Sequence, residues 1–114
     1  MPQYVLLLRD GPQFIAGLSA EEVQKLIQKY GDWRRSLGKQ ITGGHKLKDG
    51  EGRVLQKHNG KPSMTDGPFA EAKEVMAGLF VLEADSYDQA VELAKTCPHM
   101  DYGSIEVRAI ERTS

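Results

Sequence analysis

Cysteine is nearly absent from this chain, since Cys97 is the single one among 114 residues. A lone cysteine excludes an internal disulfide framework, and a reducing compartment permits that pattern. Charge of one sign is not in excess either, because 15 basic residues face 16 acidic ones and leave a formal net charge of -1. This balance excludes the strongly basic surface typical of direct nucleic-acid binding.

Long hydrophobic runs are missing as well. The apolar run near the N-terminus covers only residues 4–8, and no positive segment precedes it, so it fits neither a signal peptide nor a membrane span. We therefore expect a cytoplasmic protein without membrane contact. The chain also lacks a glycine-rich phosphate loop, a dinucleotide fingerprint and a nucleophile elbow, and no cofactor is expected.

What is present is enough for one domain, residues 1–114. The run at residues 4–8 predicts a buried strand. Ser19 and Glu22 have the reciprocal capping pattern that opens a helix, and an apolar stripe at helical spacing continues to Leu37, with Gly38 placed to end it. Residues 41–47 predict a second strand, and the turn at 49–52 predicts that residues 53–57 return as the other half of a hairpin.

The second half repeats the order of the first. Residues 58–74 are the least regular stretch, residues 75–84 predict a strand, Ser86 opens a helix that Pro98 stops, and residues 104–110 predict the last strand. This order predicts an α+β chain with the ferredoxin-like βαββαβ pattern and an inserted β-hairpin. Its two helices would cover one face of an antiparallel sheet.

The second face of that sheet needs a cover of its own, because Phe80, Leu82 and His45 could all lie on it. A second copy of the same sheet would provide the cover, which predicts a homodimer with twofold symmetry and the architecture of a dimeric α+β barrel. A monomer with a solvated second face is the alternative.

The run Thr65–Glu74 (TDGPFAEAKE) resembles the signature of the DGPF-domain branch of the YCII-related family. Three shorter segments, at residues 77–80, 97–99 and 105–108, also resemble family segments. The resemblance implies a ferredoxin-like fold that dimerises, with a candidate active site in a cleft between sheet and helix. It also implies a His–Asp pair with the histidine in the first helix, where this chain has Tyr30 and Trp33 instead. Some relatives are associated with sigma factors, which implies a transcription-related protein partner as an alternative role.

His45 is the best candidate for a general base, because its unperturbed pKa of about 6.5 lies near neutral pH. It shares a strand face with Ile41 and Leu47, so a packed core or interface histidine is the structural alternative. Asp66 would orient His45 or the ligand, although an Asp before Gly-Pro often only bonds the backbone of its own turn. His99 has a simpler explanation at a helix end, and metal binding through His99 or His45 is a third possibility, although no zinc-type ligand spacing is present.

Five further residues are candidate ligand contacts. Trp33 could line an aromatic wall, Phe69 could anchor the loop, and Arg108 could hold an anionic group in a forked pair. Lys73 and Glu74 would join them if they pointed into the cleft rather than into solvent. The leading hypothesis is therefore a homodimer that binds an unknown small molecule between the first helix, the second strand and the DGPF loop, with acid–base chemistry by His45 and Asp66. The alternative is a non-catalytic regulatory or interaction module.

Overall fold

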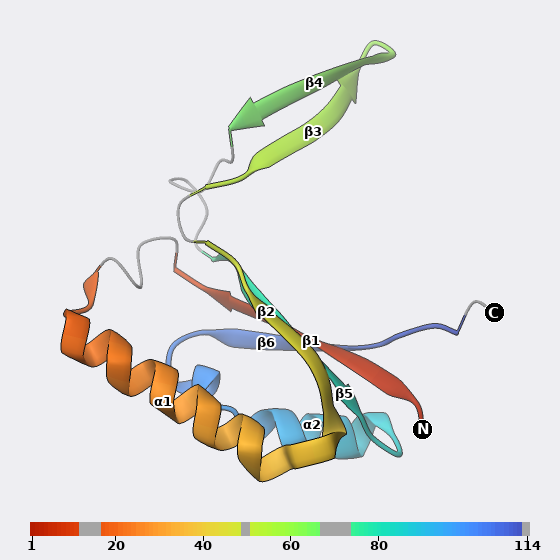
Figure 1. Ribbon diagram of the computed structural model, residues 1–114. Coiled ribbons are helices and arrows are strands. Elements are labelled where there is room, and N and C mark those ends of the chain that lie inside the picture. Colours follow the sequence, from red (N-terminus) through yellow and green to blue (C-terminus); the bar gives the residue numbers. More distant parts are fainter. Residues whose placement is uncertain (12–16, 49–50, 67–73, 113–114) are drawn as a thin grey trace.

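The computed structural model describes residues 1–11, 17–48, 51–66 and 74–112. Figure 1 shows the elements in chain order. The strands are β1 (Gln3–Asp10), β2 (Ile41–Lys46), β3 (Arg53–His58), β4 (Lys61–Asp66), β5 (Val75–Glu83) and β6 (Ser104–Ala109). The α-helices are α1 (Ala20–Leu37) and α2 (Tyr87–Lys95), and the short 3₁₀ turns are η2 (Gly38–Gln40) and η3 (Pro98–Asp101).

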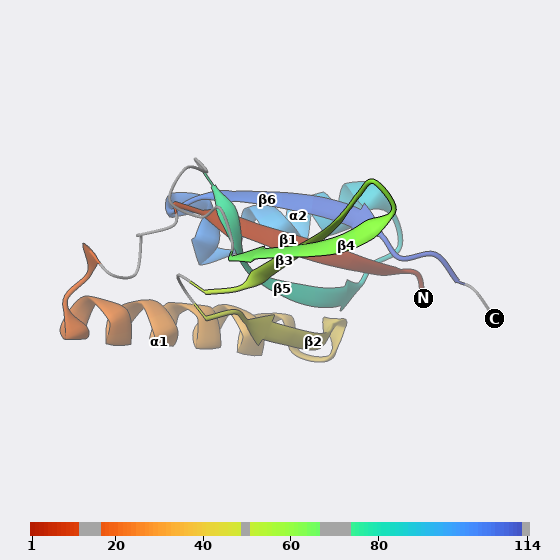
Figure 2. The same ribbon diagram turned by 90° about the horizontal axis from the view of Figure 1, so that it is seen from above.

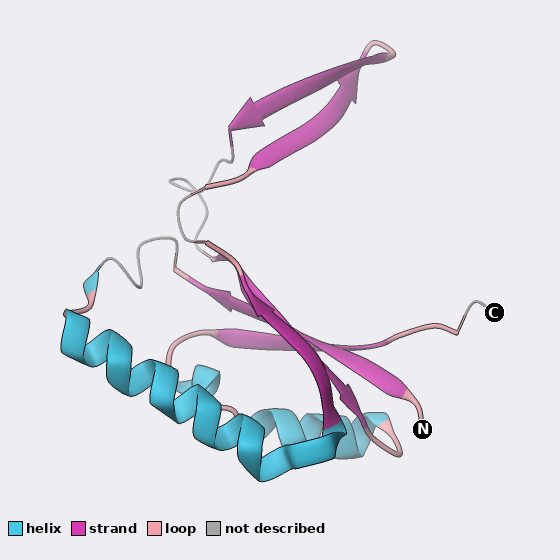
Figure 3. Cartoon of the chain, in the orientation of Figure 1, coloured by secondary structure: helices cyan, strands magenta, loops and turns pink. Residues whose placement is uncertain are grey.

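Four strands form the main sheet in the order β2-β5-β1-β6, and each neighbouring pair is antiparallel. Without β3 and β4, this is the strand order that a ferredoxin-like chain produces, with the first and third strands in the centre. Both helices lie on the same side of the sheet, as Figures 1 and 3 show. The predicted α+β fold is thus confirmed.

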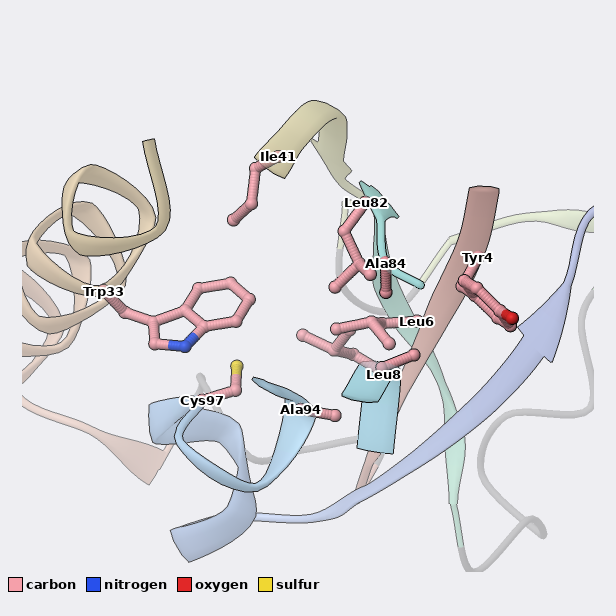
Figure 4. Packing of buried hydrophobic residues seen from close by; sticks show 10 residues of the cluster. Tyr4, Leu6, Leu8, Trp33, Ile41, Leu82, Ala84, Ala94 and Cys97 are labelled. Atoms are coloured by element: carbon pink, nitrogen blue, oxygen red, sulfur yellow. The ribbon is translucent and has the colours of Figure 1, made fainter. Parts of the chain in front are cut away.

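The helix-covered face of the sheet carries the hydrophobic core. Alternate residues of β1 point into it, and Leu6 and Leu82 are completely buried there. Figure 4 shows Trp33 of α1 and Cys97 entering the same cluster from the helical layer. Trp33 also meets Phe80 edge to face, with ring centroids 5.0 Å apart.

The prediction for the second face was wrong in part. Phe80 and Leu82 belong to the helix-covered face, because they pair with Leu6 and Tyr4 in the β1–β5 register and pack in the core. The open face carries the alternate residues instead. Val5 and Leu7 of β1 lie opposite Val81 and Leu79 of β5, and all four are half-buried in the single chain.

The inserted hairpin also differs from the prediction. Residues 53–58 do not return along β2; they pair with β4, inside the stretch that sequence patterns left irregular. The reason is the Asn59-Gly60 turn, where both residues have positive φ angles (52° and 79°). Such a two-residue turn matches the right-handed twist of paired strands, so it closes a tight hairpin. Figures 1 and 2 show this hairpin extending from one end of the main sheet.

Helix α1 begins as the sequence predicts. Ser19 accepts a hydrogen bond from the Glu22 backbone N–H (3.1 Å), and Glu22 accepts one from the Ser19 N–H (3.0 Å). Gly38 follows the last helical residue with a positive φ of 57°. Within the described residues, no helix has the length and apolar character needed to cross a membrane.

Candidate functional site

A cavity of 350 Å³ opens between α1 and the β2–β5 side of the main sheet. Its walls come from α1, β1, β2, β5 and η3, and most of the lining is apolar. The apolar lining residues are Leu8, Val23, Leu26, Ile27, Gly44, Ala77, Gly78, Leu79 and Phe80. The cavity therefore lies where sequence reasoning placed it with respect to the first helix and the second strand.

The cavity exists because the first half of α1 is not packed tightly against the sheet. Leu26 is buried, but Ile27 on the same apolar stripe is 58% exposed and lines the cavity. On the opposite wall, Gly44, Ala77 and Gly78 have side chains too small to fill the gap. A side chain at Gly44 would collide with the Phe80 ring, 2.6 Å from the added carbon. The missing side chain at Gly44 therefore makes room for the Phe80 ring in the cavity wall.

A hydrogen-bonded pair, Tyr30 and His99, forms the polar part of the wall. The Tyr30 hydroxyl lies 2.8 Å from Nδ1 of His99, and Nε2 of His99 lies 2.7 Å from the backbone carbonyl oxygen of Arg9. Both residues line the cavity, and His99 is only 2% exposed. The pair joins α1 to η3 and β1, and all hydrogen-bonding atoms of the imidazole are engaged.

The two contacts of His99 fix its tautomer. A backbone carbonyl oxygen only accepts hydrogen bonds, so Nε2 of His99 must carry the proton that it donates to Arg9. In the neutral ring Nδ1 is then an acceptor, and the Tyr30 hydroxyl donates to it. His99 is thus positioned to receive a proton that arrives through Tyr30.

The surroundings keep Tyr30 protonated. Burial raises the pKa of the Tyr30 hydroxyl well above its usual range, and the negative charges that Cys97 and Asp10 can carry raise it further. Asp10 lines the same cavity and is 5% exposed.

The structure separates the two residues proposed to act together. His45 borders the cavity with an exposed side chain on the edge strand β2, and it does not share a face with Ile41, because it pairs with Leu79 of the open face whereas Ile41 pairs with the buried Leu82. Asp66 does not line this cavity. It ends β4, its side chain is 88% exposed, and it forms an ion pair with Arg53 at 3.4 Å. The reason is the β3–β4 pairing, which directs Asp66 towards its cross-strand neighbour.

The other candidate contacts also lie away from the cavity or outside the described residues. Trp33 is 6% exposed in the core, where its indole N–H donates to the Thr96 hydroxyl at 2.8 Å. Glu74 accepts a hydrogen bond from Ser104, and Arg108 lies 3.9 Å from Glu106 on the opposite sheet face. Phe69 and Lys73 fall in residues 67–73, outside the described part of the chain.

Sequence reasoning missed Tyr30 and His99 as a pair. Tyr30 has a packing explanation on the apolar stripe, and His99 has a dipole explanation at a helix end, so neither alone indicated chemistry. The available signal was that Tyr30 stands in the first helix, where the resemblance implies a histidine. Across the described ranges, no group of three or more His, Cys, Asp or Glu side chains is placed to hold a metal ion.

One curated protein is similar to this chain in sequence over about half of its length. The chain is 34% identical over 59 residues to an uncharacterized protein of Rhizobium meliloti (strain 1021), a match that covers 50% of this chain. The chain thus matches about half the length of that relative (48%).

Two solved structures match over nearly the whole chain. One is the 5-chloro-2-hydroxyhydroquinone dehydrochlorinase of Burkholderia phenoliruptrix AC1100, with a TM-score of 0.51, 13% identity and coverage of 97% of this chain and 95% of that one. The other, a protein of Arabidopsis thaliana, has a TM-score of 0.41, 17% identity and coverage of 100% and 97%. The model of the YCII-related domain matches residues 2–114, so this chain belongs to the YCII-related family.

Proposed function

We propose that this protein binds a small, largely apolar organic molecule in the cavity beside α1 and carries out acid–base chemistry on it with Tyr30 and His99. The observation that carries this proposal is the hydrogen-bonded Tyr30–His99 pair in the wall of an apolar cavity of 350 Å³. Ligand cavities of proteins commonly combine this size, an apolar lining and a few convergent polar groups.

The proposed chemistry follows from the direction of the hydrogen bonds. A bound molecule gives a proton to the Tyr30 oxygen while the Tyr30 proton moves to Nδ1 of His99. The resulting imidazolium donates from both nitrogens, to Tyr30 and to the Arg9 carbonyl. The reverse transfer returns the proton to a product. Asp10 would stabilise the imidazolium, in place of the Asp66 partner that sequence patterns suggested.

The fold comparison supports a ligand of this size. The dehydrochlorinase was solved in complex with 2,5-dihydroxybenzoquinone, a single flat ring. A ring of that kind would be compatible with the cavity beside α1. The regulatory alternative, in contrast, expects a closed core without a sizeable pocket.

The proposed working form is a homodimer, with the open sheet face of one copy covering that of the other. Val5, Leu7, Leu79 and Val81 form an apolar centre on that face. Charges of both signs lie beside them, since Arg9 pairs with Glu106 at 2.7 Å. A face that carries both signs around an apolar centre is complementary to its own copy under a twofold axis.

A blocked cavity tests the binding proposal. Ile27→Trp would place a large ring in the cavity, whereas Val91→Trp makes the same change at an exposed position on α2 that does not line it. In a thermal-shift screen of small ring compounds, we expect compounds that raise the Tm of the natural chain and of Val91→Trp but not of Ile27→Trp. Equal shifts for both variants would place binding elsewhere.

The proposed acid–base chemistry is tested by a measurement separate from binding. For compounds that bind, exchange of an acidic C–H with solvent deuterium can be followed by NMR. We expect Tyr30→Phe and His99→Gln to slow that exchange by about a hundredfold, the size typical of general acid–base catalysis. Exchange at the natural rate in both folded variants would remove this pair from the mechanism.

A further inference from the structure

We propose, on the basis of the function above, that the cavity selects an apolar acid and holds it as its conjugate base, while His99 keeps the proton. The Tyr30–His99 pair has a limited number of hydrogens, and the cavity wall carries the positive charge of Arg34.

The hydrogen count comes first. The Tyr30 hydroxyl has a single hydrogen, and in the unliganded state that hydrogen is donated to Nδ1 of His99. Tyr30 can therefore donate to a ligand only if His99 supplies a hydrogen of its own at Nδ1. Nε2 cannot give up its proton without losing the bond to the Arg9 carbonyl. A ligand that accepts from Tyr30 thus requires the doubly protonated ring.

The charge balance decides which ligands meet that requirement. An anion accepts strongly from a phenol and also neutralises the new imidazolium, whereas a neutral acceptor does neither. The proton can come from the ligand acid itself or, for an anion already ionised in solution, from solvent. In both cases the complex contains the conjugate base, one added proton on His99 and an unchanged Tyr30.

The cavity wall contains a second group suited to an anion. Arg34 lies one helical turn after Tyr30, so the two residues face the same side of α1, and both line the cavity. A guanidinium is charged at every accessible pH and matches a carboxylate in two hydrogen bonds. Arg34 would therefore hold the acidic group beside the Tyr30 hydroxyl, with the apolar body against Leu26 and Phe80.

The other ionisable groups near His99 come from β1, α1 and its own segment. Lys29 lies 3.3 Å from the Tyr102 hydroxyl, and burial raises the pKa of Cys97 to about 11, so this thiol stays neutral at physiological pH. The groups that surround His99 are Arg9 and Asp10 on β1, Lys29 and Tyr30 on α1, and Cys97, Asp101 and Tyr102 on its own segment. Asp10 and Asp101 among them are acidic, and Lys29 and Arg9 are basic.

Calorimetry with benzoate and benzamide tests the inference. These probes share a ring and differ in charge. Titrations at about pH 7.5, roughly one unit above the ordinary imidazole pKa, are run in two buffers with different ionisation enthalpies, which gives the protons taken up on binding. We expect benzoate to bind at least tenfold more tightly than benzamide and to take up about one proton per site.

Substitutions test which residues take up the proton and which residue binds the anionic group. Tyr30→Phe removes the hydroxyl that links ligand and ring, and His99→Gln keeps a donor for the Arg9 carbonyl but cannot take the proton; both should abolish the uptake. Arg34→Gln should weaken the binding of benzoate about three- to tenfold and leave the number of protons taken up unchanged. The matched control is Arg35→Gln, since Arg35 pairs with Asp32 and does not line the cavity.

The outcomes separate this inference from the proposed function. Benzoate that binds without proton uptake, or benzamide that binds as tightly, overturns the inference and leaves the cavity as a binding site. Failure of both probes to bind a folded protein counts against the inference and the proposed function together.

Discussion

Gly103 shows how one missing side chain sets the geometry of the site. A β-carbon at this position would overlap the Arg9 carbonyl oxygen and lie 2.9 Å from Nε2 of His99. We therefore expect Gly103→Ala to cost about 1–3 kcal/mol of folding free energy and to displace the His99 ring. Denaturant unfolding and the imidazole NMR signals would report the two effects. Gly11→Ala is the control, because nothing lies within 4 Å of its β-carbon, and a similar cost there would contradict this explanation.

The Cys97 thiol gives a residue-scale prediction for pH. Burial raises its pKa from an ordinary 9.0 to about 11, so the folded state holds this proton more tightly than the unfolded chain. The resulting stability is fully present below about pH 9 and is lost as the pH rises to about 11, a change of roughly 2–3 kcal/mol. The free energy of unfolding, measured between these two pH values, should fall less steeply with pH for Cys97→Ala than for the natural chain. Parallel curves for the two proteins would show that the thiol does not titrate differently on folding.

Single residues were the hardest level to predict from sequence. His45 borders the cavity, but strand alternation from Ile41 did not predict its face, because a register shift between Ile41 and Gly43 puts the two residues on opposite faces of β2. The Tyr30–His99 contact joins residues 69 positions apart, and no local pattern encodes such a distance. Asp66 was misplaced for the same reason, since its neighbour depends on which strands pair.

At the scale of elements, local sequence signals gave correct predictions wherever nearby residues supply the hydrogen-bond partners of the backbone. The predicted capping box of α1 is confirmed in both directions, and a helix terminus needs only nearby partners for its unpaired N–H groups. The partner of β3 was predicted wrongly, because turn signals flank it on both sides and the Asn59-Gly60 turn, with two positive φ angles, pairs it with β4.

The α1 cap yields a prediction for the wall that carries Tyr30. Ser19→Ala removes the acceptor of the Glu22 N–H and should cost about 1 kcal/mol of unfolding free energy. The hydrogen bond from the Ser19 backbone N–H lowers the pKa of Glu22 from its ordinary 4.5. The stability that the Glu22 carboxylate adds is therefore present above about pH 4.5 and is lost as the pH falls further. Chemical denaturation at neutral and acidic pH checks both statements. Thr65→Ala, which removes an exposed hydroxyl on β4, is the control; an equal loss there would deny the cap a specific role.

At the scale of the whole molecule, the sequence predicts the sheet and helices but not the arrangement of the open face. The ferredoxin-like pattern predicted from the order of strands and helices is confirmed, and the sheet has the strand order typical of that pattern. The residues on each face were not predicted correctly, because both alternate sets of β5 are apolar and because a register shift between Ile41 and Gly43 puts Ile41 and His45 on opposite faces of β2. A shift of one residue exchanges the two faces of a strand, and sequence patterns do not locate such bulges.

The proposed homodimer depends on the apolar centre of the open face, and Val81 lies within it opposite Val5. Val81→Glu would bury a carboxylate without a partner at a twofold interface, at a cost of about 3 kcal/mol or more, which corresponds to at least a hundredfold weaker association. Light scattering coupled to size-exclusion chromatography should then show a dimer for the natural chain and a monomer for the variant. Val91→Glu, a similar change on the exposed side of α2, should remain dimeric. A natural chain that stays monomeric at high concentration would mean that this sheet face is solvated, and the cavity would then have to function within a single copy.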